Sequence, residues 1–173
     1  MLQPKPARSI ACLMLFCSLT ALSRGAEPSS TFSGEPNWAE LSQRGPWVFL
    51  GDSNTYAGEY IAVLDAWLQA EHEHANGVGQ PPQLLNLGVP SETASGLSEV
   101  DHPFKRPCVH ERLSKVLDML EPGVVFICYG MNDGIYQPPS AENLQSYQQG
   151  MLQLVAAIRA ETDAPLICLT PPI

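Results

Sequence analysis

The sequence predicts an α/β fold in which helices cover both faces of a parallel β-sheet. Strand-like and helix-like segments alternate along the chain, and the strand-like segments are apolar throughout. With 173 residues, 45% of them hydrophobic, the chain is long enough for one domain with a modest core. Ligands of such sheets bind beyond the carboxyl ends of the strands. The residues directly after each strand are therefore the candidates for a functional site.

The predicted strands are short apolar runs that end at glycine or polar residues. They cover residues 47–50 (followed by Gly51), 83–87, 124–129 and 166–169. Helices are predicted where apolar residues recur every three or four positions. These helices cover residues 56–71, 113–120 and a segment that starts after the N-cap Ser140 and reaches Ile158. Residues 89–108 are predicted to form a loop.

Residues 1–26 have the pattern of a secretory signal peptide. Lys5 and Arg8 precede an apolar run over residues 10–22, and small residues follow it. A mature membrane helix needs about 20 apolar residues, so we expect cleavage, with an uncleaved membrane anchor as the alternative. The protein is then exported to the periplasm or the extracellular space and keeps no membrane span.

After the leader, residues 27–44 are polar and predict a linker, and residues 45–173 predict the folded domain. The formal net charge is −9, and every acidic residue lies outside the leader. A surface of this charge repels phosphate backbones, so we expect no nucleic-acid partner. The domain has three cysteines and no Cys-x-x-Cys pair, and no disulfide is assigned. The oligomeric state is not predicted.

Three segments that follow predicted strands carry residues suited to acyl transfer. Ser53 lies at a strand-to-helix turn, Gly88 follows the second strand, and Asn132 follows the third. A glycine lets its backbone N–H approach a ligand closely, and the asparagine carboxamide offers a further donor. Donors that converge on one oxygen form an oxyanion hole, in which each donor contributes ~2.7–4 kcal/mol of transition-state stabilisation.

Structural roles are the alternatives for these residues and their neighbours. Asp52 is expected to form the turn and not to act as an acid catalyst. Ser53 could cap a helix, and Asn132 with Asp133 could be turn residues. Tyr129 and Tyr136 are candidates for either the pocket wall or the core. The acidic residues from Glu92 to Asp101 are expected to form a solvated face.

The three segments together resemble the GDSL/SGNH hydrolases. Gly51-Asp52-Ser53 followed by Asn54-Thr55 resembles their first block, Gly88 falls where the second block supplies its glycine, and Gly130-Met131-Asn132-Asp133 resembles the third. The resemblance covers residues 46–173. It implies a three-layer, flavodoxin-like α/β/α fold with Ser53 as the nucleophile. The Ser53 N–H, the Gly88 N–H and the Asn132 side chain are then the oxyanion donors, and neither a metal nor another cofactor takes part.

The family also places an Asp-x-x-His pair after its last strand, and no histidine follows Asn132 in this sequence. We therefore expect a chain truncated at its C-terminus, with the general base and its acid partner encoded beyond Ile173. His102 is the alternative base, although it precedes the third block. His72 and His74 lie about 20–25 Å along a helix from Ser53 and are excluded as bases. His110 is expected to be exposed.

The resemblance implies a serine hydrolase of small acyl or acetyl esters, acetylated carbohydrate among them, but the sequence does not identify the ester. The alternative is a non-catalytic module that binds glycans or acyl chains and keeps the fold without a base. Turnover of an aryl acetate that depends on Ser53 would separate the two functions.

Overall fold

The computed structural model describes residues 38–74 and 80–170. Within them lies one four-stranded parallel sheet with the strand order β2-β1-β3-β4. The strands are β1 (Trp47–Gly51), β2 (Leu84–Gly88), β3 (Val124–Cys128) and β4 (Leu166–Cys168). The predicted α/β fold with a parallel sheet is confirmed.

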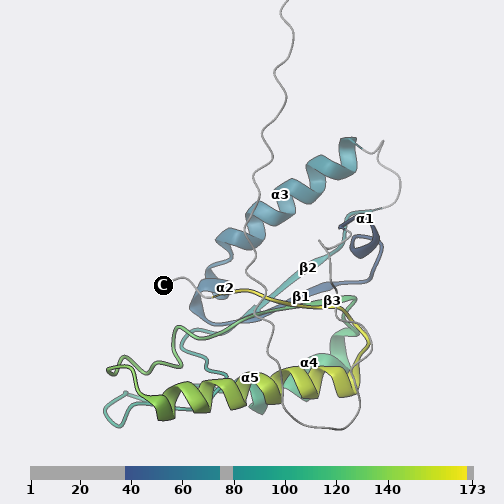
Figure 1. Cartoon of the computed structure of the whole chain (residues 1–173). Helices are drawn as coiled ribbons and strands as arrows, with labels where there is room; N and C mark the ends of the chain where they lie inside the picture. Colours follow the sequence, from purple (N-terminus) through teal and green to yellow (C-terminus); the bar gives the residue numbers. More distant parts are fainter. Residues whose placement is uncertain (1–37, 75–79, 171–173) are drawn as a thin grey trace, which may run out of the picture.

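Helices cover the sheet on both sides, so the described residues form three layers (Figure 1). α3 lies over one face, and α4 and α5 lie over the other. The helices are α1 (Trp38–Leu41), α2 (Ser53–Ala57), α3 (Glu59–His74), α4 (Leu113–Leu120) and α5 (Ala141–Glu161), with a 3₁₀ turn over Val109–Glu111. Ser140 caps α5 as predicted, since its hydroxyl oxygen accepts a hydrogen bond from the Asn143 N–H.

The prediction of one helix over residues 56–71 was wrong at its N-terminal end. Two helices, α2 and α3, occupy residues 53–74 and are separated at Gly58. Gly58 has a left-handed backbone (φ 78°) and closes α2 through a bond from its N–H to the Asn54 carbonyl oxygen. Glycine adopts this conformation without the steric cost that a Cβ brings. The short α2 therefore stays at the sheet edge, while α3 runs across the sheet.

The core explains why β1 and β3 are apolar at every position. Val48 and Leu50 of β1 pack with α4 and α5, whereas Trp47 and Phe49 pack on the α3 side. Phe126 of β3 stacks on Phe49 with ring centroids 4.4 Å apart. Both faces of these central strands are buried, as expected for a parallel sheet between two helical layers.

The part of the predicted linker that the structure describes belongs to the packed domain. Leu41 at the end of α1 is buried, and its carbonyl oxygen accepts a hydrogen bond from the Trp47 indole N–H at 3.2 Å. The predicted signal peptide lies outside the described residues. None of the helices in residues 38–74 and 80–170 combines the length and apolar character that a membrane crossing needs.

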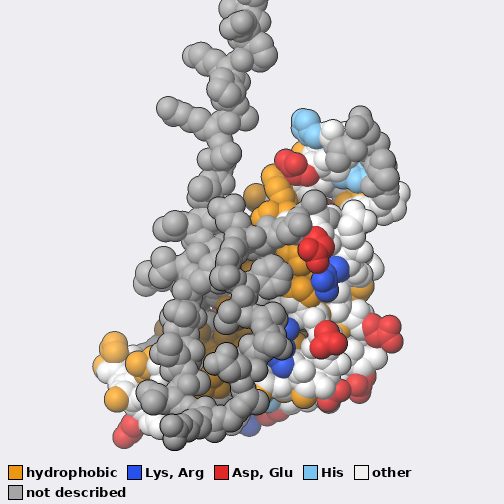
Figure 2. All heavy atoms as spheres, turned by 45° about the vertical axis from the view of Figure 1, so that its right-hand side comes forward, with side chains coloured by type: hydrophobic (Ala, Val, Ile, Leu, Met, Phe, Trp, Pro, Cys, Tyr) orange, Lys and Arg blue, Asp and Glu red, His pale blue; other side chains and the backbone are white. Residues whose placement is uncertain are grey.

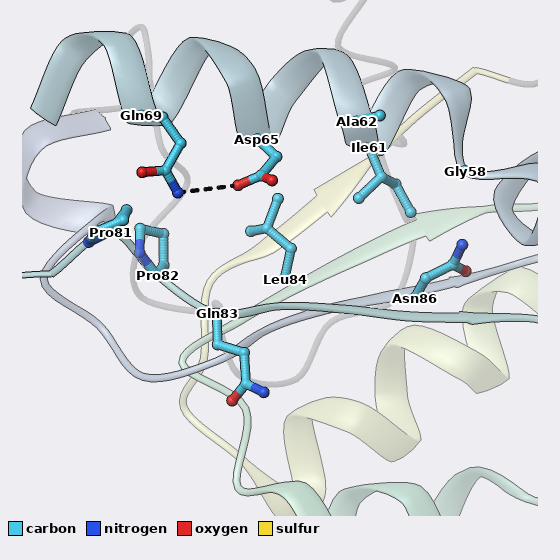
Figure 3. Close-up of a pocket in the computed structure, with 10 residues that line it drawn as sticks. All are labelled: Gly58, Ile61, Ala62, Asp65, Gln69, Pro81, Pro82, Gln83, Leu84 and Asn86. Atoms are coloured by element: carbon cyan, nitrogen blue, oxygen red, sulfur yellow. Dashed lines mark hydrogen bonds between the residues drawn. The ribbon is translucent and has the colours of Figure 1, made fainter.

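The surface carries many acidic side chains and a groove beside β2. Acidic side chains are spread over the face shown in Figure 2, with fewer basic ones among them. A groove of about 440 Å³ lies between α3 and the edge strand β2, and Asp65 and Gln69 face it from α3 (Figure 3). Ser53, Gly88 and Asn132 are not among the residues that line this groove.

Candidate active site

Strands β1, β2 and β3 end side by side. Gly51, the last residue of β1, pairs with Gly88 of β2 on one side and with Cys128 of β3 on the other. The segments that follow these strands therefore leave the sheet at one edge. This register places the three candidate segments at the carboxyl ends of neighbouring strands, where ligands of such sheets are expected to bind.

Ser53 is the first residue of α2 and is exposed at this edge. Asp52, which is buried, precedes it as the N-cap and accepts a hydrogen bond from the Asn54 N–H at 2.9 Å. A Cβ on Gly51 would lie 2.0 Å from the Thr55 hydroxyl oxygen, so the turn is too tight for a side chain there. The local packing thus places a serine hydroxyl at the surface, and Asp52 forms the turn.

Gly88 lies against the backbone of α2. A Cβ at this position would be 2.1 Å from the Tyr56 nitrogen, so this packing requires glycine. The Gly88 N–H donates a hydrogen bond to the Asn86 carboxamide oxygen at 2.9 Å. In this structure the predicted oxyanion donor therefore already has an acceptor.

Asn132 is buried, and both ends of its carboxamide have partners. Its oxygen accepts a hydrogen bond from the Arg106 guanidinium at 3.2 Å, and its nitrogen donates to the Glu92 carbonyl oxygen at 3.2 Å. A carboxamide nitrogen carries two hydrogens. Glu92 is the only acceptor found for this nitrogen among the described residues, so one N–H stays available.

One side-chain contact joins the segment that contains Ser53 to the segment that contains Asn132. Asn54, next to Ser53, approaches the sulfur of Met131, next to Asn132, at 3.1 Å. Asn132 contacts the loop after β2 at Glu92 and not at Gly88. In the described part of the chain no hydrogen bond joins Gly88 to Ser53 or Asn132.

Ser91, in the loop after β2, has a backbone N–H that could bind a ligand. Ser91 has a left-handed conformation (φ 64°). Its N–H donates no hydrogen bond to another described residue. Ser91 directly precedes Glu92, whose carbonyl oxygen contacts Asn132. This residue was not predicted from the sequence, because a serine side chain does not indicate a left-handed backbone.

The expectation of a solvated acidic face over residues 92–101 was wrong for Glu92. Glu92 is 1% exposed and forms two hydrogen bonds of 2.6 Å with the Arg112 guanidinium. The hydroxyl of buried Tyr129 donates to the same carboxylate at 2.6 Å, and burial raises the pKa of this phenol. Arg112 also donates to the Leu87 carbonyl oxygen. This network connects the loop after β2 to Leu87 in β2 and to Tyr129, the residue that follows β3.

A second arginine–glutamate pair lies close to Asn132. Arg106 is 3% exposed and donates two hydrogen bonds of 2.7 Å to the Glu99 carboxylate. These bonds lower the pKa of Glu99 to about 2. Tyr136 is exposed, and the centroid of its ring lies 5.3 Å from the Arg106 guanidinium carbon. Glu99 and Tyr136 both line a surface groove of about 650 Å³.

Asp133 connects the β3 turn to the loop after β2. One carboxylate oxygen accepts hydrogen bonds from the N–H groups of Ala94 and Ser95, at 3.0 and 2.7 Å. The other oxygen is buried and has no partner within the described residues. Burial raises the pKa of Asp133 above its ordinary value. Asp133 thus holds the loop that also contacts Asn132.

The four histidines lie in three parts of the structure: the last turn of α3, the border of a surface groove, and the 3₁₀ turn before α4. His102 borders the surface groove with one ring nitrogen on the Phe104 carbonyl oxygen, and His110 is partly buried against the Ala94 carbonyl oxygen. His72 and His74 lie in the last turn of α3, as expected. Within residues 38–74 and 80–170 no group of three or more histidine, cysteine or carboxylate side chains could hold a metal ion.

The parallel sheet, with three turns leaving one of its edges, defines an α/β protein of the SGNH-hydrolase fold. The chain belongs to the GDSL-like lipase/acylhydrolase family, whose model matches residues 49–173. This membership confirms the resemblance inferred from the three sequence blocks. A comparison with curated proteins finds no match.

Two solved structures of acetylxylan esterases support the fold. A variant of an acetyl xylan esterase from Geobacillus stearothermophilus has a TM-score of 0.53 and 20% identity, over 73% of this chain and 59% of its own. A catalytic mutant of an acetylxylan esterase from the same organism has a TM-score of 0.54 and 21% identity, over 75% and 60%. The psychrotrophic esterase EstA from Pseudoalteromonas has a TM-score of 0.48 and 23% identity, over 73% and 61%. The chain thus matches less than two thirds of each structure.

Proposed function

We propose that the protein is a serine hydrolase of small acyl or acetyl esters, with Ser53 as the nucleophile. The observation that carries this proposal is the position of Ser53, exposed at the sheet edge beside the turn that bears Asn132. Membership of the lipase/acylhydrolase family supports the same chemistry. The Ser53 oxygen attacks the ester carbonyl, the alcohol leaves, and water then releases the acid from the acyl-enzyme.

The Asn132 side chain is proposed as an oxyanion donor because its nitrogen keeps one hydrogen without a partner. The Ser53 N–H is the second proposed donor. The resemblance implies Gly88 as the third, but its N–H is bound to Asn86, whereas the Ser91 N–H is free within the described residues. We therefore propose the Ser91 amide as the competing third donor. A crystal structure with a phosphonate on Ser53 tests this: the true donor lies about 3 Å from the phosphonyl oxygen.

The general base and its acid partner are proposed to follow residue 173, in line with the family's Asp-x-x-His pair. The chain spans about 60% of the solved structures that it resembles. An in-frame Asp-x-x-His in the coding sequence within a few dozen codons would support this proposal, and an immediate stop codon would count against it. Export is likewise proposed from the N-terminal pattern, and acetylated carbohydrate outside the cell is a substrate consistent with it.

The test of ester hydrolysis is turnover of p-nitrophenyl acetate by the intact protein. Ser53→Ala is expected to abolish turnover, because no other group would carry the acyl-enzyme. Ser114→Ala, an exposed serine on α4, is the matched control and should keep full activity. Turnover that survives in Ser53→Ala would refute the proposal. Binding of acetylated glycan without turnover would instead support the non-catalytic binding module.

A further inference from the structure

The Arg106 guanidinium determines which atom of the Asn132 carboxamide points away from it. A guanidinium has only donors, so the group that faces Nη1 of Arg106 must be the carboxamide oxygen, as observed at 3.2 Å. The nitrogen is thereby directed to the opposite side, where Glu92 accepts one of its hydrogens. Rotation of the carboxamide by 180° would place two sets of donors against each other at Arg106.

Arg106 is itself held from several sides. Both oxygens of Glu99 accept its hydrogen bonds, the Ser98 hydroxyl oxygen accepts one from its backbone N–H, and the Tyr136 ring lies beside its guanidinium. The side chain is buried. The hydrogen bonds to Glu99 and Asn132 use the planar fork of arginine, which an ammonium group at the same position cannot reproduce.

We propose that Arg106 is a positioning residue for Asn132, which keeps a carboxamide N–H, and not the oxygen, directed at the developing oxyanion. This inference rests on the proposed function, in which Asn132 is an oxyanion donor. The bond from a cation also polarises the carboxamide and strengthens its N–H as a donor. An oxygen at the same place would repel the negative charge of the transition state.

The kinetic test compares two arginine-to-lysine substitutions. Arg106→Lys keeps the charge beside Glu99 but loses the fork that reaches Asn132. Arg159→Lys is the control, since the Arg159 guanidinium donates to the Ala164 carbonyl oxygen after α5 and has no hydrogen bond to Asn132 or Glu92 among the described residues. We expect kcat for p-nitrophenyl acetate to fall about 10- to 100-fold in Arg106→Lys, with KM changed less than about threefold. In Arg159→Lys we expect kcat within about twofold of wild type. Equal kcat losses in the two variants would overturn the proposal.

A second measurement does not depend on turnover. The side-chain amide resonances of Asn132, assigned by their loss in Asn132→Asp, should shift in Arg106→Lys and stay in place in Arg159→Lys. Unmoved Asn132 resonances in folded Arg106→Lys would overturn the proposal. If wild type shows no Ser53-dependent turnover, the proposed function fails, while the resonances still decide whether Arg106 orients Asn132.

A third measurement covers the case in which Arg106→Lys does not fold. In a wild-type crystal structure, Nη1 of Arg106 should lie about 3 Å from the Asn132 oxygen. A separation beyond about 4 Å would overturn the proposal, because no hydrogen bond could then fix the carboxamide.

Discussion

The Ala94 carbonyl group lies so close to Gly150 that a Cβ on residue 150 would be 2.2 Å from the Ala94 oxygen. Gly150 is a buried residue in the middle of α5, and Ala94 belongs to the loop after β2. The N–H groups of Ala94 and Ser95 bind Asp133 in the turn that also carries Asn132. Helix α5 therefore packs directly against the loop after β2, which contacts the turn that carries Asn132.

Gly150→Ala is expected to destabilise the protein. Alanine favours a helix over glycine by about 1 kcal/mol, but the new methyl group would meet a backbone carbonyl that cannot move without shifting the loop. We expect a net loss of ~1–3 kcal/mol in the free energy of unfolding, measured by urea titration. Gly134→Ala is the control, because nothing lies within 4 Å of a Cβ there. Higher stability in Gly150→Ala would contradict the close approach.

Arg112→Met is expected to be among the most destabilising substitutions. Among the described residues, it leaves the buried Glu92 carboxylate with Tyr129 as its only remaining side-chain partner. Breaking a buried ion pair in this way costs about 3–5 kcal/mol. Arg44→Met removes an exposed pair with Glu40 and should cost less than about 1 kcal/mol. Similar costs for the two substitutions, measured by denaturant unfolding, would show that Glu92 is solvated.

At Asp133, asparagine and alanine should behave differently. Asp133→Ala leaves the Ala94 and Ser95 N–H groups without their acceptor and should cost ~1–3 kcal/mol of unfolding free energy. Asp133→Asn keeps one oxygen acceptor for these N–H groups. Burial raises the pKa of the Asp133 carboxyl group, which means that burial disfavours its charged form, so we expect the neutral asparagine to cost less stability at pH 7 than alanine does. Chemical denaturation of both variants measures the difference. Equal destabilisation would mean that the charge matters more than the acceptor.

Glu99 is expected to make the stability depend on pH below about 4.5. Its pKa is about 2 in the folded protein because Arg106 binds the carboxylate, and a glutamate pKa is about 4.3 in unfolded chains. The charged form thus favours folding, and this contribution is present above the unfolded pKa and is lost as the pH falls towards 2. Glu99→Gln should therefore lose less stability between pH 4.5 and 2 than wild type does. Urea titrations at several pH values test this, and identical profiles would exclude it.

The sequence was sufficient to predict the sheet because the relevant signal is local. Runs such as Val48 to Leu50 and Val124 to Cys128 are apolar at every position, and this pattern needs no knowledge of distant residues. The parallel arrangement then places the ends of the strands at one edge, and the register of Gly51 with Gly88 and Cys128 agrees with that. The break at Gly58 was missed, since a glycine can lie within a helix or end it.

Local patterns in the sequence were thus enough to predict the α/β class, the order of the elements and the candidate residues after the strands. Three features could be found only from contacts between distant segments: the burial of Glu92 and Arg106, the bond from the Gly88 N–H to Asn86, and the left-handed backbone of Ser91. The physical reason is that burial of a charge depends on its partner. The partners of Glu92 and Asn132 lie 20 and 26 positions away, and no periodic pattern of residues reports such pairings.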